Sequence, residues 1–415
     1  MSLWAGRVEG SLDPAVWEFL RAGDAELLPY DCEASCEHAR RLFAAGILTA
    51  DELAEVESKL SEIAQDRDAI LLEDEDVHSA IERLLGETGR KIHAGRSRND
   101  QVAAAFRLYV LDACAEARDE IDALALVVLS LAETEADTLL PGYTHLQRGQ
   151  PVTLGHHLLA WVEMLDRDRT RFAAAAEAAA ESPLGAGALA GSTLELPPPP
   201  RQLRNSIDAV ADRDFALDYL YAAAVLFTHL SRFGEEIVLW ATREFGFVKL
   251  PESAATGSSM MPQKLNPDVA ELVRGKAGTM IGRLTGLLAT VKGLPLAYDR
   301  DLQEDKVPVF ATRREVYLAM QALTVLVSGL EVDRERMAEA ASDPLVLSTD
   351  AAEALVLKGQ PFRDAHEQVA EQVRKGKFKP SSTPAESVAA RGAPGPGGIE
   401  AALAEARERF SGDRL

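Results

Sequence analysis

The sequence predicts an all-α protein. Hydrophobic residues make up 47% of its 415 residues but aromatic residues only 6%, and the abundant alanine and leucine are strong helix formers. Over several long stretches apolar residues recur every three or four positions, the period of amphipathic helices that pack nearly parallel in a bundle. No repeat of fixed length is visible. We therefore expect a long central helix bundle with a smaller part on either side.

Five long stretches carry this helical period. They are Val102 to Leu131, Leu154 to Leu165, Leu226 to Trp240, Val269 to Val291 and Val316 to Leu330. A single bundle of this length often buries further faces against other subunits, so the pattern also favours an oligomer.

The bundle suggests a division into three domains: a mostly helical N-terminal domain over residues 1–100, the central bundle over 101–345 and a small C-terminal domain over 346–415. Helices are expected over 35–45 and 51–66, the second with Thr49 as its N-cap. The acidic run 74–78 is typical of a helix start. Pro197 to Pro200 predicts an extended loop, and a final amphipathic helix is expected over 399–410.

Charge and cysteine content exclude several classes of protein. The net charge of −22 argues against binding to nucleic acid or to an anionic membrane. Three cysteines make no disulfide framework, and no second ligand pair accompanies Cys32 and Cys36, so we expect no metal site. Neither a bilayer-spanning apolar run nor a leader segment is present, which predicts a soluble cytoplasmic protein.

The acidic residues are spread along the chain, which suggests a protein adapted to a salt-rich cytoplasm. The alternative is an ordinary acidic cytosolic protein. If salt adaptation is correct, the protein will unfold in dilute buffer and refold in molar KCl, as followed by circular dichroism. Full activity in dilute buffer would remove the idea.

The most informative stretch lies between two helical patterns and reads Gly-Ser-Ser-Met-Met-Pro-Gln-Lys-Leu-Asn over residues 257–266. Gly257 can serve as a hinge, and Pro262 stiffens the loop. Asn266 is expected to cap a helix that has Pro267 at its first position. The free N–H groups of that helix and the Lys264 ammonium would together favour a bound anion. The competing interpretation is a flexible polar loop.

Three other joins between helices are also rich in polar side chains. They are the runs 91–101, 141–151 and 293–306. The first contains Arg96 and Arg98, and arginine binds carboxylates in a forked geometry. Taken alone, this run could be a solvated basic loop, and His145 in the second could be a capping or core histidine.

The residues of these four stretches resemble a known family. Gly-Ser-Ser-x-x-Pro-x-Lys-x-Asn over 257–266 is similar to the signature loop of the fumarase/aspartase superfamily, whose members are homotetrameric lyases that release fumarate by β-elimination. His-Ala-Gly-Arg-Ser-Arg-Asn-Asp-Gln over 93–101, Gly-Tyr-Thr-His-Leu-Gln over 142–147 and Asp-Leu-Gln-Glu-Asp-Lys over 301–306 resemble motifs of argininosuccinate lyases. The resemblance runs from about Leu3 to the C-terminus. Adenylosuccinate lyases, fumarases and aspartases share the loop but not the run 96–101 in this form. The δ-crystallins of the eye lens belong to the same family, so a purely structural role is a formal alternative.

The resemblance implies a three-domain fold and a homotetramer with a 20-helix core. It implies the reversible cleavage of argininosuccinate into arginine and fumarate, the last step of arginine biosynthesis, without a metal or organic cofactor. It further implies that each site is built from three subunits.

The resemblance also implies roles for individual residues. Ser258 corresponds to the base, His145 to the acid for the leaving nitrogen, and Lys264 to the cation that holds the growing negative charge. The substrate contacts correspond to Ser35, Arg98, Asn99, Thr144, Asn266, Tyr298, Gln303 and Lys306, and Asp76 and Arg213 match less direct positions. Three features depart from the family: Leu265 replaces a lysine, the proline-run segment is shorter, and the C-terminal domain is short.

Overall fold

The computed structural model describes residues 12–411 and divides into two compact units. The first unit comprises Met1–Arg118, Thr170–Ala224 and Thr279–Val316, and the second comprises Asp119–Arg169, Val225–Gly278 and Tyr317–Leu415. The three-domain division expected from the sequence stays a prediction. Residues 1–11 of the expected N-terminal domain and 412–415 of the expected C-terminal domain lie outside the described residues.

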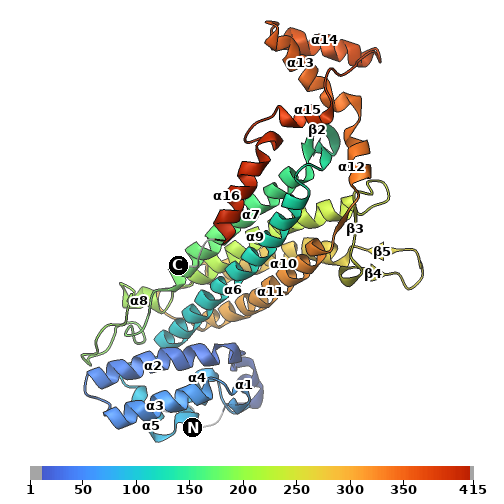
Figure 1. Ribbon diagram of the computed structural model, residues 1–415. Helices are drawn as coiled ribbons and strands as arrows, with labels where there is room; N and C mark the ends of the chain where they lie inside the picture. The colour runs from blue at the N-terminus through green and yellow to red at the C-terminus, as the bar shows by residue number, and fades with distance from the viewer. Residues whose placement is uncertain (1–11, 412–415) are drawn as a thin grey trace. The chain divides into compact units, whose positions relative to one another are not determined.

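The five helices predicted for the bundle are all present and run continuously through both units (Figure 1). The all-α prediction is confirmed. The helices are α6 (Arg98–Thr134), α7 (Leu154–Ala179), α9 (Asp214–Trp240), α10 (Asp268–Val291) and α11 (Lys306–Ser328). The last of these begins ten residues before the apolar pattern, at Lys306, so it starts within a polar motif.

The first unit contains part of the bundle and several shorter helices. The N-terminal ones are α1 (Pro14–Leu20), α2 (Leu28–Ala44), α3 (Ala50–Ile63), α4 (Val77–Leu85) and α5 (Glu87–Ile92). The short α8 (Ser206–Ala209) lies between α7 and α9 in the sequence. Thr49 caps α3 as predicted, because its hydroxyl accepts the Glu52 N–H at 3.3 Å while the Glu52 carboxylate accepts the Thr49 N–H at 3.0 Å. Asp76 caps α4 in the same way by accepting the Ser79 N–H at 2.7 Å. The acidic run is therefore a helix start.

Aromatic side chains join α6 to its neighbours inside the first unit. The Phe106 ring meets Phe215 of α9 edge-to-face at 5.3 Å between centroids, and Tyr109 meets Phe310 of α11 at 4.7 Å. Such edge-to-face pairs add to the free energy gained by burying their apolar area. The helices that carry the polar motifs are thus fixed against one another.

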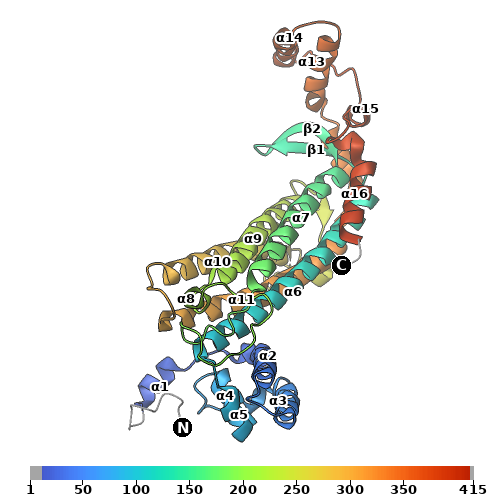
Figure 2. The same ribbon diagram turned by 90° about the vertical axis from the view of Figure 1, so that its left-hand side faces the viewer.

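Three short antiparallel ribbons lie in the second unit. They are β1 (Leu139–Thr144) with β2 (Gln147–Thr153), β3 (Val248–Lys249) with β6 (Glu331–Val332), and β4 (Thr256–Gly257) with β5 (Leu265–Asn266). The first is a hairpin whose turn lies at the end remote from α15, as Figure 2 shows. The sequence predicts only a polar join between helices here, because Pro141, Gly142 and the turn hide the alternating pattern of a strand.

The second unit has its own aromatic core between α7 and α9. The Trp161 indole stacks on Phe233 at 4.6 Å and on Trp240 at 5.7 Å. Its N–H donates to the Glu236 carboxylate at 2.7 Å, and His157 Nε2 lies 2.9 Å from the same oxygen. The one polar atom of the buried indole is therefore satisfied.

The C-terminal helices also belong to the second unit. They are α12 (Arg334–Ala341), α13 (Ser348–Leu357), α14 (Phe362–Arg374), α15 (Pro384–Ala389) and α16 (Ile399–Ser411). Short 3-10 turns join several elements along the chain: Ala25–Leu27, Arg67–Ala69, Glu252–Ala254, Arg300–Asp305, Pro344–Leu347 and Pro396–Gly398. The predicted final helix is confirmed as α16, whose Arg409 donates to Asp166 of α7 at 2.7 Å. No helix among residues 12–411 is long and apolar enough to cross a bilayer.

Candidate active site

One pocket of about 380 Å³ in the first unit gathers most of the predicted substrate contacts. Its wall is built from the end of α1, the start of α4, the start of α6 and the segment before α11. The predicted residues in that wall are Asp76, Arg98, Asn99, Tyr298, Gln303 and Lys306, and the others are Ala22, Asp24, Glu75, His93, Ser97, Val102 and Arg300. Residues more than two hundred positions apart therefore share one cavity.

Ion pairs hold the charged groups of this pocket in place. Arg98 Nε lies 3.3 Å from Asp76 Oδ2. Burial opposes ionisation of Asp76, but the charges of His78 and Arg98 outweigh it and hold the pKa of this carboxyl below its ordinary value. The carboxylate is therefore ionised at neutral pH.

A buried triad lies behind the pocket. Asp305 accepts a hydrogen bond from Arg213 Nε and another from Lys306 Nζ at 2.7 Å. Arg213 and Asp305 are buried, as is Lys306. Arg213, predicted as a less direct contact, thus acts on the pocket through Asp305, which fixes the Lys306 ammonium.

Ser35, predicted as a direct substrate contact, does not line the pocket. It is completely buried in α2, where its hydroxyl donates to Asp31 at 3.2 Å and accepts from Arg96 at 2.8 Å. Asp31 also accepts from Gln101 at 2.8 Å and lies 2.7 Å from His78 Nδ1. In this conformation Ser35 supports Arg96, and its role as a substrate contact stays a prediction.

The pocket holds a histidine that stays neutral. Burial, together with the charges of Arg96 and Arg98, lowers the pKa of His93 to about 4. Burial and the nearby Asp305 carboxylate raise the pKa of the Tyr298 hydroxyl. Both groups are therefore uncharged at neutral pH and can bind substrate only through neutral hydrogen bonds.

A second histidine in this region, His38, is expected to make the folded protein less stable in acid. His38 is buried, its Nε2 lies 3.0 Å from the Ala94 carbonyl, and burial and the Arg96 charge lower its pKa from 6.5 to about 3. The unfolded chain binds the extra proton between these pH values, so stability is complete above pH 6.5 and falls as the pH drops towards 3, by about 1.4 kcal/mol per pH unit. Urea unfolding of the parent and of His38→Gln at several pH values will check this. An equal loss in both proteins would contradict it.

Thr144 and His145 lie together at the turn of the β1–β2 hairpin in the second unit. Both side chains are exposed. Thr144 pairs with Gln147 across the turn, and Tyr143 pairs with Arg148. The Tyr143 ring lies 5.6 Å from that of Phe245, which anchors the hairpin next to its turn.

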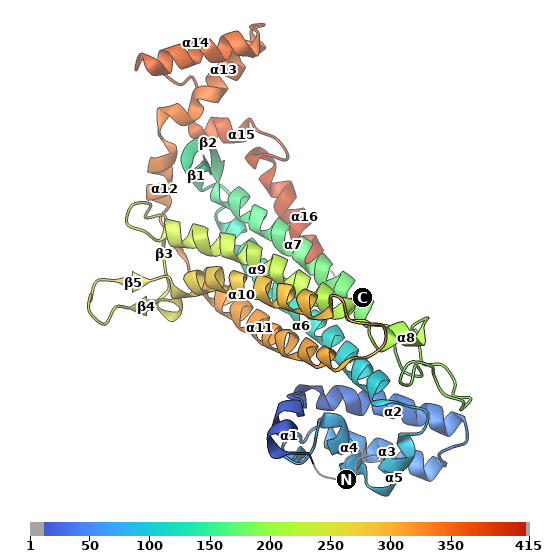
Figure 3. The ribbon, with the colours of Figure 1, turned by 180° about the vertical axis from the view of Figure 1, so that it is seen from behind.

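Ser258 and Lys264 occupy the projecting loop between β4 and β5, and Asn266 is the last residue of β5 (Figure 3). The Ser258 hydroxyl oxygen accepts the N–H groups of Met260 at 3.3 Å and Met261 at 3.0 Å. Lys264 is exposed, and no ion pair to it is found within residues 12–411. The loop thus offers a hydroxyl held by two amides and an unpaired cation.

The predicted N-cap at Asn266 is wrong. Asn266 lies in β5, where it pairs with Thr256, and α10 begins at Asp268 after Pro267. The Asn266 side chain donates to the Thr256 hydroxyl at 3.4 Å, and that hydroxyl donates to Asp268. Asn266 pairs with Thr256 instead of capping α10, because the two ends of the loop meet as a short antiparallel ribbon.

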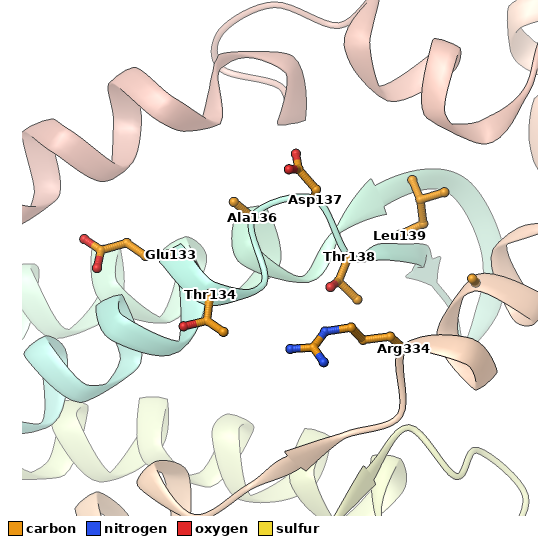
Figure 4. A pocket seen from close by; sticks show the side chains of 8 residues that line it. Glu133, Thr134, Ala136, Asp137, Thr138, Leu139 and Arg334 are labelled. Carbon is orange, nitrogen blue, oxygen red and sulfur yellow. The ribbon is translucent and has the colours of Figure 1, made fainter.

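A second hollow lacks this chemistry. It lies in the second unit and is lined by Glu133, Thr134, Asp137, Thr138 and Arg334 among others (Figure 4). Arg334 already binds the Glu135 carboxylate through both nitrogens at 2.6 and 2.9 Å, so its charge is neutralised. None of the four polar motifs lies in this hollow. Within residues 12–411 no cluster of three or more His, Cys, Asp or Glu side chains could hold a metal ion.

Five polar residues of the pocket are not predicted from the sequence: Asp24, Glu75, His93, Ser97 and Arg300. Asp24 gave no signal because it lies outside any motif. Its nearness to the site becomes visible only in the fold, where it accepts the N–H of Val77 at the start of α4. Arg300 lay inside a recognised motif and could have been chosen.

Comparison with known proteins places this geometry in a family. The model of a family described as lyase matches residues 24–282, and that of the argininosuccinate lyase C-terminal segment matches residues 345–388. The argininosuccinate lyase of Frankia casuarinae is 52% identical over 391 residues, covering 90% of this chain and 84% of its own. The chain belongs to the argininosuccinate lyase family. The argininosuccinate lyase of a Synechococcus strain is 47% identical, over 89% of this chain and 80% of its own.

Solved structures support membership of the same superfamily. An EDDS lyase in complex with formate superposes with a TM-score of 0.80 at 27% identity, over 97% of this chain and 91% of that one. A class II fumarase from Schistosoma mansoni superposes with a TM-score of 0.75 at 15% identity, over 95% and 92%. At that identity the fumarase shares only the fold, so the substrate must be inferred from the argininosuccinate lyase relatives.

Proposed function

We propose that the chain catalyses the reversible β-elimination of argininosuccinate to arginine and fumarate, with Ser258 as base. The reaction is supported by the 52% and 47% identity to two argininosuccinate lyases, and the role of Ser258 by the pair of backbone amides on its hydroxyl oxygen. A hydroxyl is a poor base, but hydrogen bonds to its charged form favour that form. The two N–H donors of Met260 and Met261 therefore favour a deprotonated Ser258.

The reaction requires one proton to leave carbon and another to reach nitrogen. Ser258 takes the proton from the carbon next to a succinate carboxylate, which leaves that carboxylate with enediolate character. The unpaired Lys264 ammonium stabilises the added charge, usually the largest contribution to such catalysis. The bond between the neighbouring carbon and the guanidinium nitrogen then breaks, and His145 protonates that nitrogen.

The first-unit pocket suits the substrate by its charges. Argininosuccinate carries three carboxylates, an ammonium and a guanidinium, so its site needs both signs of charge. The pocket wall has the carboxyl groups of Asp24, Glu75 and Asp76 and the cations of Arg98, Arg300 and Lys306. Asn99 and Gln303 add neutral amides.

The proposal includes a homotetramer whose sites combine elements of several chains. The helix α10 has exposed apolar side chains at Leu272, Ile281 and Leu288, which are 60%, 51% and 48% accessible. Gly278, Gly282 and Gly286 recur along it at every fourth residue, with no atom within 4 Å of an added Cβ. A helix with this surface is suited to close packing against the same helix of another copy. A cytoplasmic location belongs to the same proposal.

The substrate assignment predicts a clear preference in an ultraviolet assay of fumarate formation. Argininosuccinate should be turned over at least about 10³-fold faster, by kcat/KM, than adenylosuccinate, malate or aspartate, because charged groups left unpaired by a wrong substrate are costly. Comparable turnover of adenylosuccinate would contradict the proposed substrate and indicate another member of the superfamily. Turnover of none of the four would favour the non-catalytic, crystallin-like alternative.

A further inference from the structure

Two adjacent residues, neither of them glycine, adopt the left-handed conformation at the turn of the β1–β2 hairpin. His145 and Leu146 both have φ near +56°. Thr144 and Gln147 pair directly on either side, so these two residues form the whole turn. Two-residue turns with positive φ at both positions match the twist of the strands and normally use Asn-Gly. A leucine there is strained, because its Cβ approaches the backbone carbonyl.

Burial of the Leu146 side chain does not offset this strain. The side chain is 68% exposed, at the rim of a hollow lined by Tyr143 and Phe245. The hairpin stem enforces the turn instead. Leu140 and Thr153 are buried in the stem, and an added Cβ on Gly142 would meet the Gln150 carbonyl at 2.9 Å. The two strands thus approach closely beside the turn, which restricts the movements that would relieve it.

We propose that Leu146 is a positioning residue, whose left-handed backbone fixes the direction of the His145 imidazole. The inference rests on the proposed role of His145 as the acid. Successive side chains of a strand point to opposite faces, so a different turn, or a register changed by one residue, would turn His145 away. Strained backbone is retained at a functional position where the surrounding structure determines it, as the stem does here. A different explanation of the exposed leucine is a direct apolar contact with another copy.

Substitutions that differ in their tolerance of positive φ separate these explanations. Gly and Asn adopt the left-handed conformation readily, whereas β-branched Val resists it. We expect Leu146→Asn and Leu146→Gly to keep kcat within about 3-fold of the parent. Leu146→Val should lower kcat by about 10- to 100-fold, the scale of a displaced catalytic group, while KM for argininosuccinate changes by less than about 3-fold.

Two results would overturn the proposal. One is parental kcat in Leu146→Val. The other is a loss in Leu146→Asn as large as in Leu146→Val, which would assign the effect to the side-chain contact. Should Leu146→Val not fold, as judged by circular dichroism and oligomer size, Leu146→Thr and Leu146→Gly provide the same contrast. Neither has the leucine contact, but β-branched Thr resists the left-handed conformation that Gly adopts readily. Gly should therefore be several-fold faster, and equal rates would refute the idea.

A companion variant separates failure of this inference from failure of the proposed function. His145→Asn removes the acid itself. Full turnover in His145→Asn would remove the acid assignment, and the positioning role with it. Loss of turnover in His145→Asn with an unaffected Leu146→Val would remove the positioning role alone.

Discussion

Replacing Ser258 by alanine is expected to lower kcat for argininosuccinate cleavage by about 10²- to 10⁴-fold, the contribution typical of a positioned base. The hydroxyl lies in a loop between two short strands, where two backbone amides already favour its charged form. Because the β4–β5 pairing does not involve this side chain, the loop should keep its fold and the proposed oligomer should stay intact. Fumarate absorbance and size-exclusion chromatography together measure both outcomes.

The neighbouring hydroxyl supplies the matched control. Ser259 is exposed in the same loop, and no hydrogen bond from its side chain is found within the described part of the chain. Ser259→Ala should therefore lower turnover far less than Ser258→Ala. If Ser258→Ala keeps most of the parental rate, another group abstracts the proton and the assignment of the base is wrong.

The second large effect is on stability. Asp305→Leu should lower the free energy of unfolding by about 3–5 kcal/mol, because removing one partner of a buried ion pair leaves uncompensated buried charge. In this molecule two cations would remain, Arg213 and Lys306, both of which donate to Asp305. Turnover should fall as well, since Lys306 in the pocket wall would lose its fixed position.

Urea unfolding monitored by circular dichroism measures this effect. The exposed pair of Arg40 and Glu57, 2.7 Å apart, provides the control. Glu57→Gln should leave the unfolding midpoint nearly unchanged, because solvent screens exposed pairs. A similarly small change in Asp305→Leu would mean that the triad does not support the pocket.

Much of the fold could be predicted because the signals for a helix lie within its own sequence. The apolar period marked all five bundle helices, and Thr49 marked the start of α3 through a capping box. The β1–β2 hairpin was missed for a physical reason. Its turn uses His145 and Leu146 where Asn-Gly would have given a signal, and Pro141 and Gly142 interrupt the alternating pattern of its first strand.

Residues of the candidate site could be predicted from the sequence only where they lie in a recognisable motif. The motifs led to Arg98, Asn99, Tyr298, Gln303 and Lys306, and the fold gathers these in one pocket. Asp24 lay outside every motif and could be found only from the packing of the N-terminal helices. The prediction that Asn266 caps α10 was wrong because strand pairing at the base of the loop competes with capping. The local sequence does not decide between the two.

The proposed site combines elements from different copies of the chain, and mixing inactive variants tests this arrangement most directly. Ser258→Ala damages only the loop, and Asn99→Ala damages only the first-unit pocket. Refolded together in equal amounts, the two should recover about a quarter of the parental activity, since random assortment of subunits restores that share of intact sites. If the mixture stays as inactive as either variant alone, loop and pocket do not combine between copies.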